Sequence, residues 1–240
     1  MASQKDIEII NKIKQSNLND YDNLYQLYQM MLIVFEDNKD DLDYCLKISK
    51  FIKEFAPYRH EATGDERFEE LYYLALLFEA QNHIFESYMI YLEKDREPEE
   101  RFYLPRRKQL TKLGIIQALQ DFIDGKTEIL SLSVAPGTGK TTLEFFLITA
   151  WIGWYPQLCN LFSSHSGHVT RMAYDAVSNI LTSSEYKWRT IFPYVDIESV
   201  SAKEQYINVG KFKNFKSITF RAIGASQTGT TRADGILFCD

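Results

Sequence analysis

The chain has 240 residues, of which 45% are hydrophobic, so it can bury the core of one large domain or of one domain with an appendage. Its net charge of −6 is uneven, because residues 1–100 carry −11 and residues 101–240 carry +5. Three widely spaced cysteines exclude a disulfide framework and a cysteine-based metal site, and the sequence shows neither a signal peptide nor a transmembrane segment, so we expect a soluble intracellular protein.

The acidic first part shows the apolar spacing of helices. Residues 6–55 have helical periodicity, with breaks rich in Asn and Asp at 17–22 and 37–41. This pattern predicts a small bundle, which we assign as a helical N-terminal extension over 1–60. Residues 56–60 with Gly64 read as a linker, and a long helix over 65–95 makes 61–100 a connecting element.

A basic segment precedes the most informative motif. Pro105 favours the start of a helix that ends at Gly125, and its head carries a cluster of cations with Gln109 among them. These residues are either solvated side chains or contacts to an anionic partner, and basic charge at a helix N-terminus slightly favours the second reading. The cluster consists of Arg101, Arg106, Arg107 and Lys108.

The stretch ILSLSVAPGTGKTT, residues 129–142, has the pattern of a phosphate-binding loop, or Walker A motif. The apolar run Ile129–Val134 predicts a buried strand, the glycines allow a tight turn, and an apolar helix follows. Val134 departs from the usual glycine at that position, and a chance glycine-rich turn is the alternative. Lys140 would reach the β- and γ-phosphates of ATP, and the Thr141 hydroxyl would bind Mg²⁺. The candidate nucleotide-binding residues are Gly137, Thr138, Gly139, Lys140, Thr141 and Thr142.

A second strand and helix follow the loop. Residues 158–162 predict a buried strand, 163–167 a Ser/His turn, and 168–182 a helix, so the order of elements favours a mostly parallel sheet. Ligands of such sheets bind where the strands end. His165 lies at that point and would contact phosphate or DNA; the alternative is an ordinary loop histidine.

The last part of the chain predicts a hairpin and a final strand. Strands at 205–209 and 217–223 flank a basic tip that contains Lys211, Lys213 and Lys216. The apolar run ending in Asp240 resembles a Walker B strand, whose acid holds the water shell of Mg²⁺. Because a buried strand should not end a chain, we expect these residues to be the front piece of a longer protein.

Four blocks of sequence together resemble one family. RFYLPRRKQL, SLSVAPGTGKTT, LFSSHSGHVTRMAYDAV and TGTTRADGILFCD are similar to the ATPase domain of the large subunit of tailed-bacteriophage terminases, over about residues 85–240. The resemblance implies an α/β P-loop NTPase fold of the RecA/ASCE-like type. Its mostly parallel sheet would be flanked by helices, would occupy 101–240 and be truncated at Walker B, and would follow an all-α N-terminal region.

The resemblance also implies a function and partners. Such a protein is an ATP-hydrolysing motor that packages double-stranded viral DNA into the procapsid, in the cytoplasm of the infected bacterial host, with a nuclease domain expected beyond residue 240. The portal protein and the small terminase subunit are implied partners, and a homo-oligomeric ring is the implied active form. By position, Lys140, Asp240 and Arg232 are catalytic, Thr141 and Asp240 bind Mg²⁺, and Gln109 contacts adenine.

Two departures and two alternatives accompany this expectation. The loop has Ala135 and Pro136 where many terminases have an arginine, and the acid that normally follows Asp240 is absent, so the chain should bind ATP better than it hydrolyses it. A helicase-like DNA-stimulated ATPase shares the same motifs. A nucleotide-binding docking module without turnover is the third interpretation. The candidate contacts to the DNA backbone are Arg106, Arg107, Lys211, Lys213 and Lys216.

Overall fold

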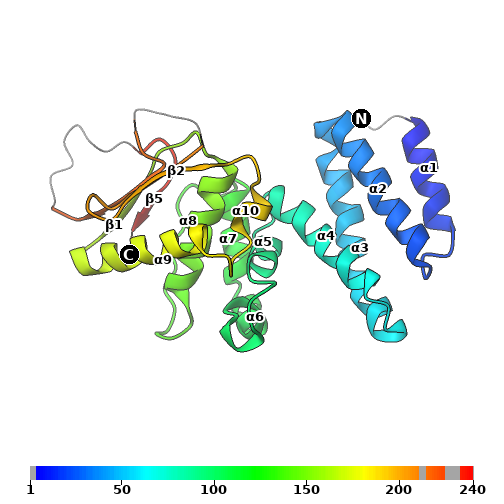
Figure 1. The fold of residues 1–240 in the computed structure, drawn as a ribbon, viewed down its shortest axis with the longest axis horizontal. Helices are drawn as coiled ribbons and strands as arrows, with labels where there is room; N and C mark the ends of the chain where they lie inside the picture. Colours follow the sequence, from blue (N-terminus) through cyan, green and yellow to red (C-terminus); the bar gives the residue numbers. More distant parts are fainter. Residues whose placement is uncertain (1–3, 211–214, 225–232, 240) are drawn as a thin grey trace. The chain divides into compact units, whose positions relative to one another are not determined.

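A computed structural model describes residues 4–210, 215–224 and 233–239 of the chain (Figure 1). The chain divides into two compact units, Met1–Asn82 and His83–Asp240. The division falls inside the segment that the sequence predicts as a single connecting helix. Because each unit has its own internal packing, the two are described in turn.

The first unit is built from helices around one apolar core. Its aliphatic and aromatic side chains recur at helical spacing, so each helix buries one face. Fully buried examples are Leu24 and Leu27 on one helix and Ile48 and Ile52 on the next. The elements are α1 (Gln4–Gln15), α2 (Tyr21–Asp37), the 3₁₀ turn η1 (Lys39–Asp41), α3 (Leu42–Thr63) and α4 (Arg67–Gln81).

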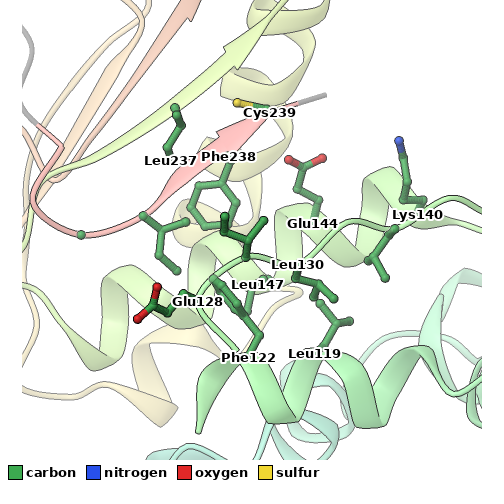
Figure 2. Close-up of a pocket in the computed structure, with 14 residues that line it drawn as sticks. Leu119, Phe122, Glu128, Leu130, Lys140, Glu144, Leu147, Leu237, Phe238 and Cys239 are labelled. Atoms are coloured by element: carbon green, nitrogen blue, oxygen red, sulfur yellow. The ribbon is translucent and has the colours of Figure 1, made fainter. Parts of the chain in front are cut away.

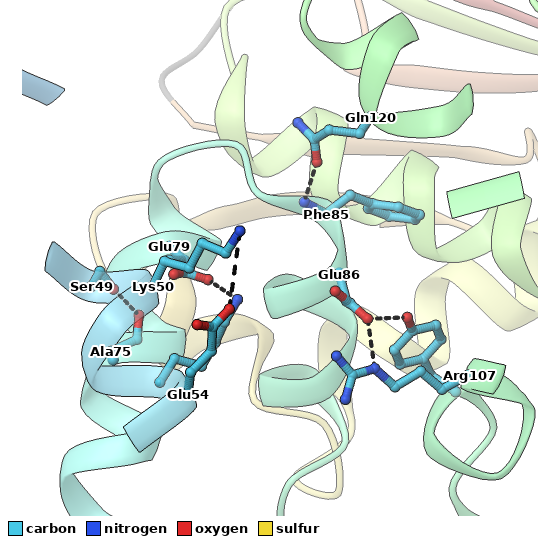
Figure 3. Close-up of polar contacts among 11 residues, drawn as sticks. Ser49, Lys50, Glu54, Ala75, Glu79, Phe85, Glu86, Arg107 and Gln120 are labelled. Atoms are coloured by element: carbon cyan, nitrogen blue, oxygen red, sulfur yellow. Dashed lines mark hydrogen bonds and ion pairs between the residues drawn. The ribbon is translucent and has the colours of Figure 1, made fainter. Parts of the chain in front are cut away.

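Two polar contacts join α3 to α4 (Figure 3). The Ser49 hydroxyl donates to the carbonyl oxygen of Ala75 at 3.1 Å, and the Lys53 ammonium pairs with the carboxylate of Glu79. The Glu79 side chain is only 3% exposed, so this ion pair is largely removed from water. Because loss of one partner would leave a buried charge, the pair fixes how the two helices align.

The predicted linker at 56–60 is wrong, because α3 continues through it to Thr63. Ala56 is fully buried in the bundle, and that packing outweighs the loss of one backbone hydrogen bond at Pro57. Gly64, in the left-handed conformation (φ 69°), ends the helix, and its N–H donates to the His60 carbonyl at 2.8 Å.

The single helix predicted over 65–95 is also wrong. Asn82 ends α4, because its backbone N–H and its side-chain amide both donate to the carbonyl of Phe78. His83 then has a positive φ of 67°, which no helix continues through. The imidazole stacks on the ring of Tyr155 at 5.3 Å, so packing within the second unit stabilises this unusual backbone.

The second unit contains most of the helices and all of the described strands. The helix predicted over 105–125 is divided at Gly114, whose φ of 71° interrupts the helical ladder. The helical elements are α5 (Phe85–Leu92), η2 (Pro98–Glu100), α6 (Tyr103–Lys112), α7 (Ile115–Ile123), α8 (Lys140–Trp154), α9 (Gly167–Thr182) and α10 (Trp188–Ile191).

The sheet is mixed, in the order β2-β3-β4-β1-β5. β1 pairs in parallel with β4 and β5, whereas β2 with β3 and β3 with β4 are antiparallel. Helix α9 packs on β1 and β4 (Figure 1). The strands are β1 (Asn160–Ser164), β2 (Ile197–Ser201), β3 (Tyr206–Val209), β4 (Ile218–Ala222) and β5 (Leu237–Cys239).

The expected fold class, a mostly parallel P-loop sheet, is therefore wrong. The described strands form a small mixed sheet in a mainly helical chain. The hairpin predicted from residues 205–223 is present as β3 and β4, and its short connection requires antiparallel strands. β2, which the sequence did not reveal, pairs on the far side of β3 and adds a second antiparallel pairing.

The strand predicted at 129–134 does not form. Ile129 is 88% exposed, and the segment has no regular secondary structure. Leu130 and Leu132 instead line a pocket of about 500 Å³ that residues Ile236–Cys239 also line, so a gap separates this segment from β5. A strand needs a neighbour at hydrogen-bonding distance, and the gap removes it.

Helix α8, which begins at the candidate phosphate loop, is anchored by a buried polar network. The hydroxyls of Tyr88 and Thr149 are 2.8 Å apart, and the indole N–H of Trp188 donates to the Thr149 carbonyl at 2.8 Å. All three side chains are fully buried. α8 is therefore held to α5 and α10, which fixes the direction in which its N-terminus points.

Candidate functional site

The loop of residues 135–139 has the backbone of an anion cradle. Gly137 and Gly139 have φ values of 82° and 90°, a region that other residues avoid. Between them, Thr138 turns inward, and its hydroxyl donates to the Ala135 carbonyl at 2.9 Å. The glycine at each side of this threonine therefore lets the chain curl tightly.

Helix α8 starts directly at the end of this curl. Gly139 is the N-cap, Lys140 is the first helical residue, and the first backbone bond runs from Leu143 N–H to the Gly139 carbonyl at 3.0 Å. The N–H groups of the first helical turn have no partner within the helix and carry the positive end of its dipole. Such a turn is suited to bind an anion.

A pocket of about 510 Å³ surrounds the loop. Its lining consists of Val134–Thr142 together with two side chains of the α6 segment, Phe102 and Arg106. A Cβ placed on Gly139 would lie 2.4 Å from the ring of Phe102, so only glycine allows this contact. The aromatic ring therefore forms a wall of the pocket directly beside the residue that precedes Lys140.

Glu93 holds Phe102 in place. Its carboxylate accepts hydrogen bonds from the backbone N–H of Phe102 at 2.9 Å and of Tyr103 at 2.9 Å, at the start of α6. The Glu93 side chain is almost completely buried. Burial raises the pKa of this carboxyl, although the two N–H groups and the nearby Arg96 and Arg101 oppose the rise.

The raised pKa of Glu93 makes the free energy of unfolding depend on pH. Because the folded-state pKa is above the unfolded value, the Glu93 side chain contributes its full stabilisation below the unfolded pKa. This stabilisation is lost as pH rises through the folded pKa. We expect the wild-type free energy of unfolding, minus that of Glu93→Gln, to fall over this window and then level off. Urea unfolding from pH 4 to pH 8 measures the difference; a flat difference would contradict the assignment.

A second pocket lies on the other side of Lys140. Its lining includes Lys140 and Glu144 from α8, Leu130 and Leu132 from the extended segment, and Cys239 from β5. Figure 2 shows Lys140 and Glu144 extending from the same helix in the same general direction, as expected of residues four apart. Lys140 therefore lines both the loop pocket and the pocket that β5 lines.

Hydrogen bonds fix the start of β5 against β1. The Asp234 carboxylate accepts from the N–H of Cys159 at 2.7 Å, and the side-chain oxygen of Asn160 accepts from the N–H of Ile236 at 2.8 Å. β1 and β5 run in parallel with Ser163 opposite Cys239, so their carboxyl ends share one edge. Residues 235–239, which include all of β5, line the pocket that Lys140 also lines.

The other predicted residues are placed less favourably or lie outside the described residues. Gln109 is exposed on α6 and is not among the residues that line the loop pocket. His165 is exposed after β1, with its Nδ1 3.4 Å from the Ser164 hydroxyl. Arg232, Asp240, Lys211 and Lys213 lie outside the described residues.

The predicted loop residues come together, because they are consecutive. Gly137, Thr138, Gly139, Lys140, Thr141 and Thr142 all line the loop pocket. Sequence reasoning missed three contributors: Phe102, Glu93 and Glu144. The spacing of four residues from Lys140 could have revealed Glu144. Phe102 reaches the loop only through tertiary packing, and Glu93 acts on the loop pocket only through its hydrogen bonds to the start of α6.

The described residues contain neither a metal-binding cluster nor a membrane-spanning helix. Within residues 4–210, 215–224 and 233–239, no group of three or more His, Cys, Asp or Glu side chains is arranged to hold a metal ion. In the same part of the chain, no helix is both long and apolar enough to cross a membrane. Of the two expected Mg²⁺ ligands, Thr141 lines the loop pocket, and Asp240 is outside the described residues.

Comparisons with known proteins give no relative for this chain. No protein-family model matches it, no curated protein matches its sequence, and no solved structure matches its fold.

Proposed function

We propose that this chain binds the phosphate groups of ATP at residues 135–142 and acts as an ATP-hydrolysing subunit of a DNA-packaging motor. One observation carries the nucleotide part. Lys140 is the first residue of a long helix and follows a turn with two positive-φ glycines, Gly137 and Gly139, in a pocket whose described lining contains no carboxylate. This arrangement rests on the loop and the helix, and it does not require a mostly parallel sheet.

Each part of the loop has a separate task in this proposal. The N–H groups at the start of α8 donate hydrogen bonds to phosphate oxygens, and the Lys140 ammonium neutralises their charge. The Thr141 hydroxyl, which lines the same pocket, is the candidate ligand for Mg²⁺. Because the pocket lining described above lacks acidic groups, nothing in it opposes a polyanion.

Binding of MgATP to the 240-residue chain tests the nucleotide part directly. Isothermal titration calorimetry should show saturable binding that is lost when Mg²⁺ and ATP are replaced by adenosine. Failure to saturate at millimolar MgATP would reject the proposal.

The motor part rests on the sequence blocks that resemble terminase large subunits. Under this proposal the partner is double-stranded DNA, with the portal protein and the small terminase subunit as further partners, and a ring of copies is the active form. Lys216 is the described member of the basic hairpin tip, and its ammonium lies 4.4 Å from the centre of the Tyr206 ring. Arg107, in contrast, pairs with Glu86 at 2.7 Å.

If the lysines of the hairpin tip contact the DNA backbone, the affinity of the chain for DNA should depend strongly on salt concentration. We expect affinity for duplex DNA to fall steeply with salt and to show little sequence preference. Lys216→Ala should reduce the slope of log affinity against log salt by roughly 1. Fluorescence anisotropy with two unrelated duplexes measures both properties. The control is Lys126→Ala, because Asp121 and Asp124 already neutralise that lysine; an affinity that does not change with salt would rule out the contact.

A further inference from the structure

Arg106 is the one side chain from α6 that brings positive charge into the loop pocket. Its guanidinium carbon lies 4.8 Å from the centre of the Phe102 ring, and one of its N–H groups donates to the Phe102 carbonyl at 3.1 Å. The same ring packs against Gly139. The Phe102 ring thus contacts both Arg106 and Gly139, which places Arg106 next to the loop.

The charges around Arg106 distinguish it from its neighbours. Arg107 pairs with Glu86, and Arg96 pairs with Glu100. Within the described part of the chain, no carboxylate forms an ion pair with Arg106, and its one hydrogen bond is the contact to Phe102. Most of the guanidinium donors are therefore available to a ligand.

The pocket lining holds Arg106 and Lys140, both cationic, and no carboxylate among its described members. A guanidinium presents a planar fork of donors that matches two phosphate oxygens at once. A polyphosphate bound at the loop would gain a second cationic contact there. A nucleobase, which is uncharged, would gain little from the charge itself.

We propose that Arg106 is a specificity-determining residue that binds the phosphate chain of the nucleotide and favours a triphosphate over a shorter chain. The inference rests on the proposed nucleotide-binding function of the same loop. It also assigns Arg106 to the nucleotide, whereas the sequence groups this residue with candidate DNA contacts.

The experiment compares Arg106→Gln, Arg106→Lys and the control Arg107→Gln in the whole chain, with MgATP, MgADP, AMP and inorganic tripolyphosphate as probes. Arg106→Gln should weaken binding of ATP and tripolyphosphate by roughly 10- to 100-fold, as for loss of a charged hydrogen bond, and binding of AMP far less. Arg106→Lys should recover part of this loss, because the charge remains. Arg107→Gln should bind like wild type.

Several outcomes would overturn the assignment. Equal losses for ATP and AMP would indicate a contact to the base or the ribose. Unchanged nucleotide binding together with weaker DNA binding would assign Arg106 to DNA. If wild type itself bound no nucleotide, the proposed function would fail, whereas wild-type binding that Arg106→Gln leaves intact would reject this inference alone.

Discussion

Replacing Lys140 with alanine should abolish measurable ATP binding and leave the fold intact. The lysine is only partly buried and lines two pockets, so we expect its ammonium to contribute more to ligand binding than to the packing of the core. Removing one partner of a desolvated charge pair should weaken binding by roughly 100-fold or more. Alanine is well tolerated at the start of a helix, so α8 should form normally.

Calorimetric titration with MgATP and circular dichroism measure the two halves of this expectation. Lys126→Ala is the matched control, because it removes a lysine that lines neither pocket and that pairs with Asp121 and Asp124 at 2.9 Å. If Lys140→Ala bound and hydrolysed ATP like wild type, the motor assignment could not stand.

Gly139→Ala should destabilise the second unit much more than Gly137→Ala. Both glycines have positive φ, so each alanine costs about 1–2 kcal/mol in the backbone. At Gly137 a Cβ meets nothing within 4 Å, whereas at Gly139 it would lie 2.4 Å from the Phe102 ring. In Gly139→Ala, the forced displacement of that ring should lower the free energy of unfolding by about 1–3 kcal/mol more.

A second substitution separates the steric contribution from the backbone contribution to the destabilisation by Gly139→Ala. Phe102→Ala in the Gly139→Ala background should recover the steric part alone, so the two changes should be non-additive. Urea unfolding of wild type, Gly139→Ala, Phe102→Ala and the double variant measures this coupling. Equal destabilisation by Gly137→Ala and Gly139→Ala would show that the ring moves aside at no cost.

The sequence located the loop because its chemistry is local. Two glycines separated by one threonine, with a lysine directly after the second, specify positive φ and a helix start, and the structure has both. Local sequence could not show whether residues 129–134 form a strand, because a strand requires an adjacent strand to pair with. The alternation of Leu and Ser in this segment fits a sheet, yet a pocket separates Leu130 and Leu132 from β5.

Long-range packing explains the other differences. Pro57 and Gly64 read locally as a linker, but burial of Ala56 carries α3 past the proline. The breaks at His83 and Gly114 divide helices whose apolar spacing is continuous in sequence. The sequence did not reveal Glu93 as a site residue, because its role comes from N–H groups at the start of a helix that begins ten residues later.

The division at Asn82 has an optical consequence. All three tryptophans, Trp151, Trp154 and Trp188, belong to the unit His83–Asp240, and Met1–Asn82 contains none. Indole fluorescence therefore reports unfolding of the loop-bearing unit alone, whereas the far-ultraviolet dichroism of the helices sums both units. Two signals from one sample thus separate the stability of the helical bundle from that of the unit that carries residues 135–142.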